Sequence, residues 1–255
     1  MATQLLFYNE ITPLSVDRHK GWFIRPVQDY SFTKSTHAVP LMAIEFLNAA
    51  GDYPIVFVGE DDNMMPVALL GLQESENIYV GDDGRWEGKY VPAFIRRYPF
   101  VLSQGDDQDK AFLCIDESYP GFNQNQDGTA LIGDDDKASE YTDGILRFLS
   151  QFQAEYQRTK VICKRLRELN LLEPKQAEAK LPNGQTKAIN GFYTVERSRV
   201  LTLASDVQLD LLRSGVYEMV CHHLASLRNL NTLGEHGLSG DSALAPSFAS
   251  TTSVP

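Results

Sequence analysis

The chain has 255 residues, 43% of them hydrophobic, and its 34 acidic and 23 basic side chains give a net charge of −11. This composition is typical of a soluble globular protein and excludes a fibrous or wholly disordered chain. The excess of acid disfavours nucleic acids and anionic membranes as partners, because both attract basic surfaces.

Residues 1–115 predict an antiparallel sheet of short strands. Apolar runs bounded by turn residues indicate such strands, and they lie at 21–27, 54–58, 66–72, 100–103 and 111–115. Asp83-Gly84 separates 77–80 from 85–86 and predicts a hairpin, since glycine accepts the positive φ that such turns need. One helix is expected at 40–51, with Pro40 at its first position, Gly51 at its end, and Leu41, Ile44 and Leu47 on one face.

An acidic crossing, residues 104–143, follows and predicts a loop-rich connection between two halves of the molecule. It holds eleven carboxylates against the two lysines Lys110 and Lys137. Its segment Asn123–Gly128 is similar to the front of a calcium loop, but Asn123 at position 1 and Asp134 at position 12 depart from the usual ligands. An asparagine-rich turn is the favoured interpretation, and no metal site is predicted.

Residues 139–233 predict a mainly helical half. A long helix is expected from Ser139 to Asn170, because apolar residues recur there at helical spacing. Residues 173–185 indicate a polar connector and 192–195 a strand. Ser205 and Gln208 match a capping box at the start of a helix, and a last helix is expected over 216–230. Residues 234–255, rich in Gly, Ser, Ala and Pro, predict a disordered tail.

Together these elements predict an α+β protein in which an antiparallel, β-rich N-terminal half with one helix packs against a mainly helical C-terminal half. Neither half is bounded by a long linker, so residues 1–233 are expected to form a single domain. Cys114, Cys163 and Cys221 are too scattered for a disulfide framework. The sequence shows no signal peptide and no run of the ~20 apolar residues that span a bilayer, which predicts a cytoplasmic protein without membrane insertion.

The sequence contains no GxSxG, P-loop, GxGxxG or HExxH motif, so the catalytic residues, if any, are unknown and no cofactor is predicted. Adjacent helical residues point about 100° apart, which disfavours a metal shared by His222 and His223. His223 falls on the apolar stripe of the last helix, where a buried, hydrogen-bonded histidine is favoured. The alternative is a catalytic base that works with carboxylates from the acidic crossing.

Two arginines among aromatic residues form the main candidate binding site. Arg96 and Arg97 follow Trp86 and Tyr90, and guanidinium groups bind carboxylates in a bidentate manner or stack on rings. These four residues predict a site for an anion or for the end of a peptide. The alternative is that both arginines only pair with local carboxylates or backbone carbonyls.

Several strings of the sequence follow one another in an order typical of one bacterial family. The most distinctive is YVPAFIRRYPF at Tyr90–Phe100, and others lie at 39–41, 52–57, 70–72, 77–80, 84–86 and 191–195. Over residues 5–233 the chain resembles the SapC family. The resemblance implies an accessory role in the uptake or modification of peptides or small molecules, because relatives occur beside flavin-dependent tryptophan halogenases, TonB-dependent receptors and cupin-like proteins. The resemblance assigns no catalytic residues to this chain.

Three functions are therefore open. The first, which we favour because no reactive side chains converge in the sequence, is a non-catalytic binding or accessory protein. It would hold a peptide, or a partner such as a halogenase or cupin-like protein, near Trp86, Tyr90, Arg96 and Arg97. The second is an enzyme of unrecognised type that uses His223. The third, implied by the family's surface-array label, is a structural component of a surface layer.

Overall fold

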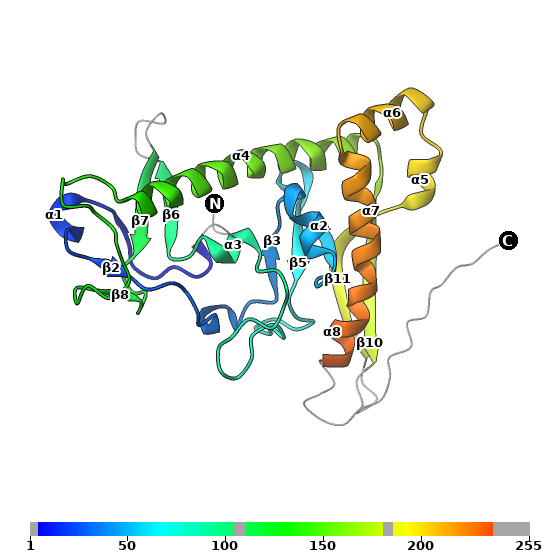
Figure 1. The fold of residues 1–255 in the computed structure, drawn as a ribbon. Helices are drawn as coiled ribbons and strands as arrows, with labels where there is room; N and C mark the ends of the chain where they lie inside the picture. The colour runs from blue at the N-terminus through cyan, green and yellow to red at the C-terminus, as the bar shows by residue number, and fades with distance from the viewer. Residues whose placement is uncertain (1–4, 105–110, 181–185, 237–255) are drawn as a thin grey trace.

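The long helix α4 (Glu140–Glu168) is the element that joins the parts of the molecule (Figure 1). The computed structural model describes residues 5–104, 111–180 and 186–236. At 1.5 Å per residue, α4 is about 43 Å long. Ser139 caps it, since its hydroxyl accepts a hydrogen bond from the backbone N–H of Thr142 at 3.2 Å. The predicted long helix is confirmed.

The largest sheet has five strands, and each strand is antiparallel to its neighbours. Its order is β10 (Leu172–Lys180), β11 (Thr186–Val195), β4 (Ile55–Val58), β5 (Met65–Leu69) and β3 (Ala38–Pro40). Every residue of β5 is buried, as expected for a strand covered on both faces. The strands predicted at 54–58 and 66–72 are confirmed as β4 and β5, and the structure shows that they pair with each other.

Two smaller sheets lie toward the N-terminal end of α4 (Figure 1). One has the order β1 (Ile11–Pro13), β7 (Ala111–Asp116) and β6 (Phe100–Gln104), and the other has the order β8 (Phe122–Asn123), β2 (Phe23–Ile24) and β9 (Thr129–Ala130). The strands predicted at 100–103 and 111–115 are confirmed, and they pair with each other. Since β8 and β9 belong to the acidic crossing, this segment is partly a sheet and not only loops.

The remaining elements are short helices, and the predicted α+β class is confirmed. They are α1 (Val16–His19), η2 (Ser31–Thr33), η3 (Ala43–Glu45), α2 (Phe46–Ala49), η4 (Asp61–Asn63), α3 (Ala93–Arg96), α5 (Arg197–Leu201), α6 (Ser205–Arg213), α7 (Val216–Ser226), η5 (Leu227–Asn229) and α8 (Leu230–His236). Among the described helices, none combines the length and the apolar character needed to cross a membrane.

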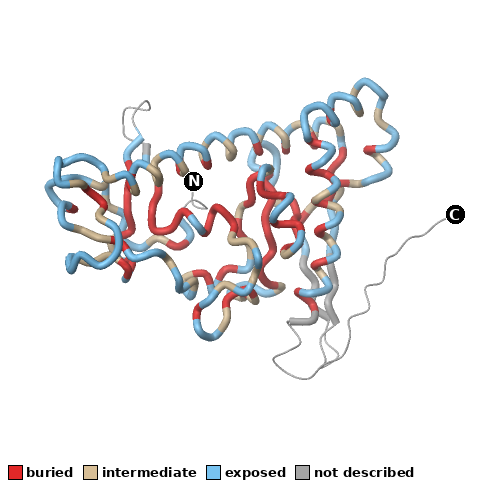
Figure 2. Tube along the Cα trace, in the orientation of Figure 1, coloured by how far each residue is buried: buried red, intermediate tan, exposed pale blue. Residues whose placement is uncertain are grey.

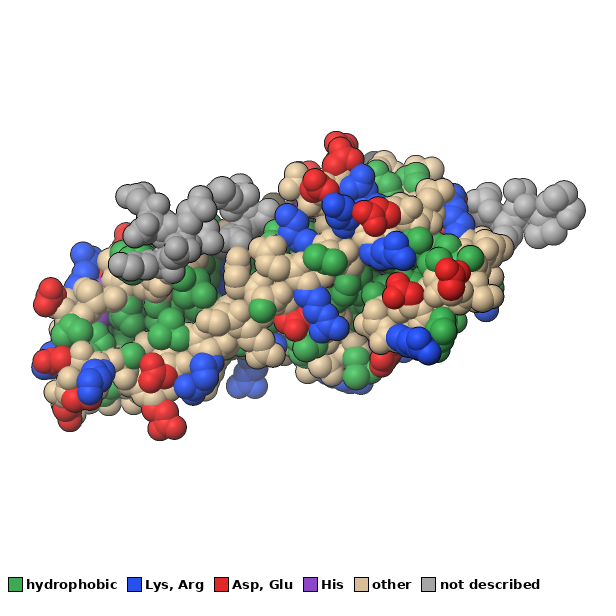
Figure 3. Space-filling view, turned by 90° about the horizontal axis from the view of Figure 1, so that it is seen from above, with side chains coloured by type: hydrophobic (Ala, Val, Ile, Leu, Met, Phe, Trp, Pro, Cys, Tyr) green, Lys and Arg blue, Asp and Glu red, His purple; other side chains and the backbone are tan. Residues whose placement is uncertain are grey.

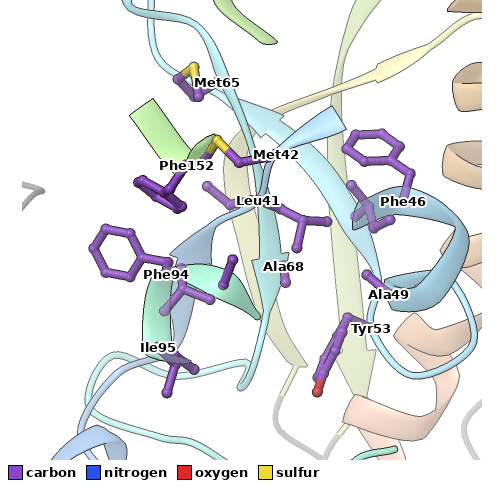
Figure 4. Close-up of a cluster of buried hydrophobic side chains, with 14 of the residues drawn as sticks. Leu41, Met42, Phe46, Ala49, Tyr53, Met65, Ala68, Phe94, Ile95 and Phe152 are labelled. Atoms are coloured by element: carbon purple, nitrogen blue, oxygen red, sulfur yellow. The ribbon is translucent and has the colours of Figure 1, made fainter. Parts of the chain in front are cut away.

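The core lies between the five-stranded sheet and the helices that cover it. Figure 2 shows buried backbone along the central strands and beneath α4. Figure 4 shows Leu41 and Phe46 from the 40–49 segment, Ala68 of β5, Phe94 of α3 and Phe152 of α4 gathered in one cluster. Because these side chains come from distant parts of the sequence, the two halves share a core.

The predicted helix at 40–51 is wrong in its start and in its buried face. Pro40 belongs to strand β3, and the helical residues begin at Ala43. Ile44 and Leu47 are 54% and 64% exposed, and the buried side chains include Glu45. The prediction failed because a carboxylate occupies the buried face, which an apolar pattern does not anticipate.

Four further predictions are corrected. Of the connector predicted at 173–185, residues 173–180 belong to strand β10 because β11 pairs with them, and 181–185 lie outside the described residues. The hairpin at 77–86 is reduced to one bridge between Val80 and Trp86. Ser205 does not cap α6: Gln208 instead donates to the carbonyls of Val200 and Leu201 at 3.2 and 3.0 Å. Gly234 lies in α8, so the tail predicted at 234–255 starts too early. Residues 237–255 lie outside the described residues.

The hydroxyl of Thr159 joins α4 to η3, because it accepts the Ala43 N–H at 2.9 Å and donates to the Glu155 carbonyl at 2.7 Å. Thr159→Val keeps the shape of the side chain but leaves the Ala43 N–H without its acceptor. We expect a loss of about 1–2 kcal/mol in the free energy of unfolding, measured by urea denaturation. Val161→Thr at a site 69% exposed on the same helix is the control. Equal stability of the two variants would contradict this role.

Candidate functional site

An aromatic hollow lies between the N-terminal half of α4, the end of α3 and the segment that follows β2. It has a volume of about 320 Å³, within the range of small-ligand pockets. Its lining is Ile24, Pro26, Val27, Tyr30, Ile95, Arg96, Tyr98, Pro99, Phe100, Tyr141, Ile145 and Phe148. We call this the Arg96 hollow, because Arg96 is the one charged residue in that lining.

The guanidinium of Arg96 is held in place by two hydrogen bonds. Its Nε donates to the Val91 carbonyl at 2.9 Å, and its Nη2 donates to the Tyr90 hydroxyl at 3.2 Å. Its Cζ lies 5.5 Å from the ring centroids of both Tyr90 and Phe148, within the range of cation–π contacts. Arg96 is exposed, and a guanidinium has five N–H donors. Donors therefore remain for an anion in the hollow.

The carboxylate of Glu45 is linked to Arg96 through the Tyr90 hydroxyl. Glu45 is 4% exposed and accepts from the Met42 N–H at 2.8 Å, the Ala93 N–H at 2.7 Å and the Tyr90 hydroxyl at 2.8 Å. Burial raises the pKa of Glu45, and the three donors and the charge of Arg96 oppose that rise. A continuous chain of hydrogen bonds thus runs from a buried carboxylate through Tyr90 to an exposed cation.

Trp86 is hydrogen-bonded to the backbone of Tyr90. Its indole N–H donates to the Tyr53 hydroxyl at 3.0 Å and to the Tyr90 carbonyl at 3.2 Å. The Tyr53 hydroxyl also donates to the Tyr90 carbonyl, and Asp52 accepts the Tyr90 N–H at 2.9 Å. Because the indole N–H of Trp86 already donates to Tyr53 and Tyr90 within the protein, we assign Trp86 the role of positioning the 86–91 segment.

Arg97 lies apart from the hollow, in the core. It is 4% exposed, and its Cζ is 4.2 Å from the Phe94 ring centroid and 5.2 Å from that of Phe152. The structure therefore brings Trp86, Tyr90 and Arg96 into one bonded group and places Arg97 among aromatic rings beneath α4.

The hydroxyls of the hollow stay protonated at neutral pH. Burial raises the pKa of Tyr30, while the positive charge of Arg96 lowers it. Burial, followed by the charge of Asp116, raises the pKa of Tyr98 to about 12, and burial also raises that of Tyr141. Since the tyrosines are neutral and Arg96 is cationic, the hollow favours an anion with an apolar body.

A second hollow of about 420 Å³ adjoins the first and shares Pro26 and Tyr98 with it. Its rim includes both Arg25 and Asp29, so it has charges of both signs. The Asp29 carboxylate accepts from the hydroxyl and N–H of Ser31, which lowers its pKa. The second hollow thus has no net preference for an anion and could accommodate an uncharged part of the same ligand.

The buried, hydrogen-bonded His223 that the sequence favoured is confirmed, and the alternative of a catalytic base is not supported by its contacts. Its Nε2 accepts the Val195 N–H at 3.0 Å and its Nδ1 donates to the Ile55 carbonyl at 2.8 Å. It is 0% exposed, and burial lowers its pKa to about 4. Proton transfer needs a ring nitrogen within reach of a substrate, and both nitrogens are used by backbone groups. His223 therefore has a structural role.

Other candidate groups show local structural roles. Asn123 Oδ1 accepts from the N–H groups of Asn125 and Asp127 at 3.1 and 3.2 Å, an asparagine turn as favoured from the sequence. Burial raises the pKa of the Cys114 thiol, and it raises that of Cys163 to about 12. Among the described residues no three His, Cys, Asp or Glu side chains gather in a way that could hold a metal ion.

Sequence reasoning missed Glu45 and the tyrosines of the Arg96 hollow. Tyr30, Tyr98 and Tyr141 are separated by tens of residues, and nothing in the sequence indicates that they converge. One feature of the sequence could have pointed to Tyr98. It lies next to the two arginines, in the string that most strongly indicated the family.

The chain matches the family model SapC over residues 14–233. No curated protein was found to match it, and no solved structure was found to match it.

Proposed function

The chain belongs to the SapC family, and on that premise we propose that it is a non-catalytic binding protein that holds the carboxylate end of a peptide, or a similar apolar carboxylate, in the Arg96 hollow. The observation that supports this most is the fixed guanidinium of Arg96 at the edge of an otherwise uncharged, aromatic hollow. A carboxylate would bind the remaining Arg96 donors, and the aromatic lining would contact an aromatic side chain edge to face.

The chemistry of the hollow supports binding more than turnover. Apart from Arg96, its titratable groups are tyrosines with raised pKa values, and these tyrosines do not change charge near pH 7. General acid–base catalysis works best with a group whose pKa lies near the operating pH. An accessory role in uptake or modification fits this picture, because the protein would hold one end of a peptide and leave the rest accessible.

The test is titration with two small probes, N-acetylphenylalanine and its amide, followed by NMR. We expect the free acid to shift the Arg96 Nε–H signal and the amide to bind at least about tenfold more weakly, because charge-assisted hydrogen bonds contribute about 1.5–3 kcal/mol. Arg96→Ala should weaken binding of the acid to the same extent. The matched control is Arg158→Ala, at an exposed arginine on α4. Equal binding of acid and amide, or no effect of Arg96→Ala, would refute the proposed site.

A further inference from the structure

A second apolar surface lies at the C-terminal end of α4, away from the Arg96 hollow. Leu201, Leu209, Leu212 and Tyr217 are 52%, 43%, 61% and 38% exposed, and all four line a hollow of about 340 Å³ between α5, α6 and the start of α7. We call these four residues the α6 face. Figure 3, which looks down on α4 and α6, shows hydrophobic side chains exposed among charged ones at this end.

The apolar residues of α6 exceed what its packing against the protein requires. Leu211, 1% exposed, anchors the inner side of the helix. Leu209 and Leu212 point away from that side and remain in contact with solvent. Exposed apolar side chains that cluster around a hollow indicate an interaction surface.

The charges on the outer side of α6 indicate which partner fits. Asp206 and Arg213 lie three residues before and four residues after Leu209, so they share its face of the helix. Both are exposed, and neither forms an ion pair within the part of the chain that the structure describes. Asp210, in contrast, is paired with Arg165 of α4 at 3.6 Å. The face thus has an acid at one end, a base at the other and leucine between them.

We propose that the α6 face is a self-association surface, on which two copies of this chain pair their α6 helices antiparallel about a two-fold axis. A two-fold interface uses the same patch on both copies, so the patch must be complementary to itself. Antiparallel pairing places Asp206 of one copy opposite Arg213 of the other at both ends, with Leu209 and Leu212 of both copies between them. Parallel pairing would instead place like charges together.

The dimer should be weak. The proposed interface consists of the four apolar side chains of the α6 face and the two charged residues beside them, whereas a standard specific interface covers about 800 Å² on each partner. We therefore expect a dissociation constant on the order of tens of micromolar. The surface is separate from the Arg96 hollow, so its test does not depend on the proposed ligand.

Sedimentation equilibrium of the full chain at concentrations from about 10 to 500 µM covers values below and above the expected dissociation constant. Asp206→Arg and Arg213→Asp should each weaken the dimer at least about tenfold, because each places like charges opposite one another. The double variant should restore it. An equimolar mixture of the two single variants should also dimerise, since each offers the charge that the other lacks. Leu212→Asp should abolish the dimer, whereas Leu47→Asp on α2, also at an exposed leucine, should not.

Circular dichroism of each variant checks that the fold is retained. A wild-type chain that is monomeric at every concentration would overturn the proposal, and this is also the outcome expected if an unrelated partner covers the face. A dimer that none of the α6 variants weakens would overturn it as well. Single variants that are weakened but fail to dimerise when mixed would show that α6 does not pair antiparallel.

Discussion

Replacing Glu45 by alanine is expected to lower the free energy of unfolding by about 4 kcal/mol. The substitution removes the acceptor of three donors, the N–H groups of Met42 and Ala93 and the hydroxyl of Tyr90, and each unsatisfied buried group costs about 1–3 kcal/mol. Relief of the buried charge offsets part of this loss, because burial penalises the ionised carboxyl. Urea denaturation at pH 7 measures the difference.

The same variant should also weaken the binding of N-acetylphenylalanine. Without Glu45 the Tyr90 hydroxyl loses its acceptor, so this hydroxyl, which accepts a hydrogen bond from Arg96, is held less firmly in place. Glu74→Ala, at an exposed glutamate, is the control and should change neither property. A Glu45→Ala protein as stable as this control would show that the hydrogen bonds of Glu45 have no net effect.

The second large effect is expected at His223. His223→Gln should lower the free energy of unfolding by about 3 kcal/mol at pH 7, because a glutamine side chain cannot both accept from Val195 and donate to Ile55 with the geometry of the ring. Urea denaturation gives the value. His37→Gln, at an exposed histidine, should leave stability unchanged.

The difference between wild type and His223→Gln should depend on pH in a defined direction. The pKa of His223 is about 4 in the folded protein and 6.5 in the reference state. Between these values the unfolded chain binds a proton that the folded chain does not bind, so the stability due to His223 is complete above pH 6.5 and is lost as pH falls to about 4. The shift corresponds to about 3 kcal/mol.

The wild type must be compared with His223→Gln because Glu45 changes the free energy of unfolding with pH in the opposite direction. Its pKa is raised in the folded protein, so its contribution to stability falls as pH rises through that folded pKa. Only the difference between the two proteins isolates His223. A difference that stays constant from pH 7 to pH 4.5 would contradict a buried, neutral His223.

The sequence by itself determined the elements whose patterns are local. The spacing of Ile145, Leu149 and Phe152 predicted α4, because one helix face must be apolar to pack on a core. The apolar runs at 54–58 and 111–115 predicted strands β4 and β7, and the string at Tyr90–Phe100 indicated the family. It also drew attention to Arg96 through its aromatic neighbours.

Only the tertiary structure decided what each polar residue of these elements does. Two adjacent arginines have the same local sequence, yet Arg96 lines a hollow and Arg97 is buried, because α3 turns the two side chains toward different surroundings. Glu45 lies in a helix that its sequence predicted to be apolar on one face. It is buried because two donors from a distant segment, the Tyr90 hydroxyl and the Ala93 N–H, converge on it together with the nearby Met42 N–H. Hydrogen bonds between residues far apart in sequence leave no periodic signal, so the candidate site became visible only once the chain was folded.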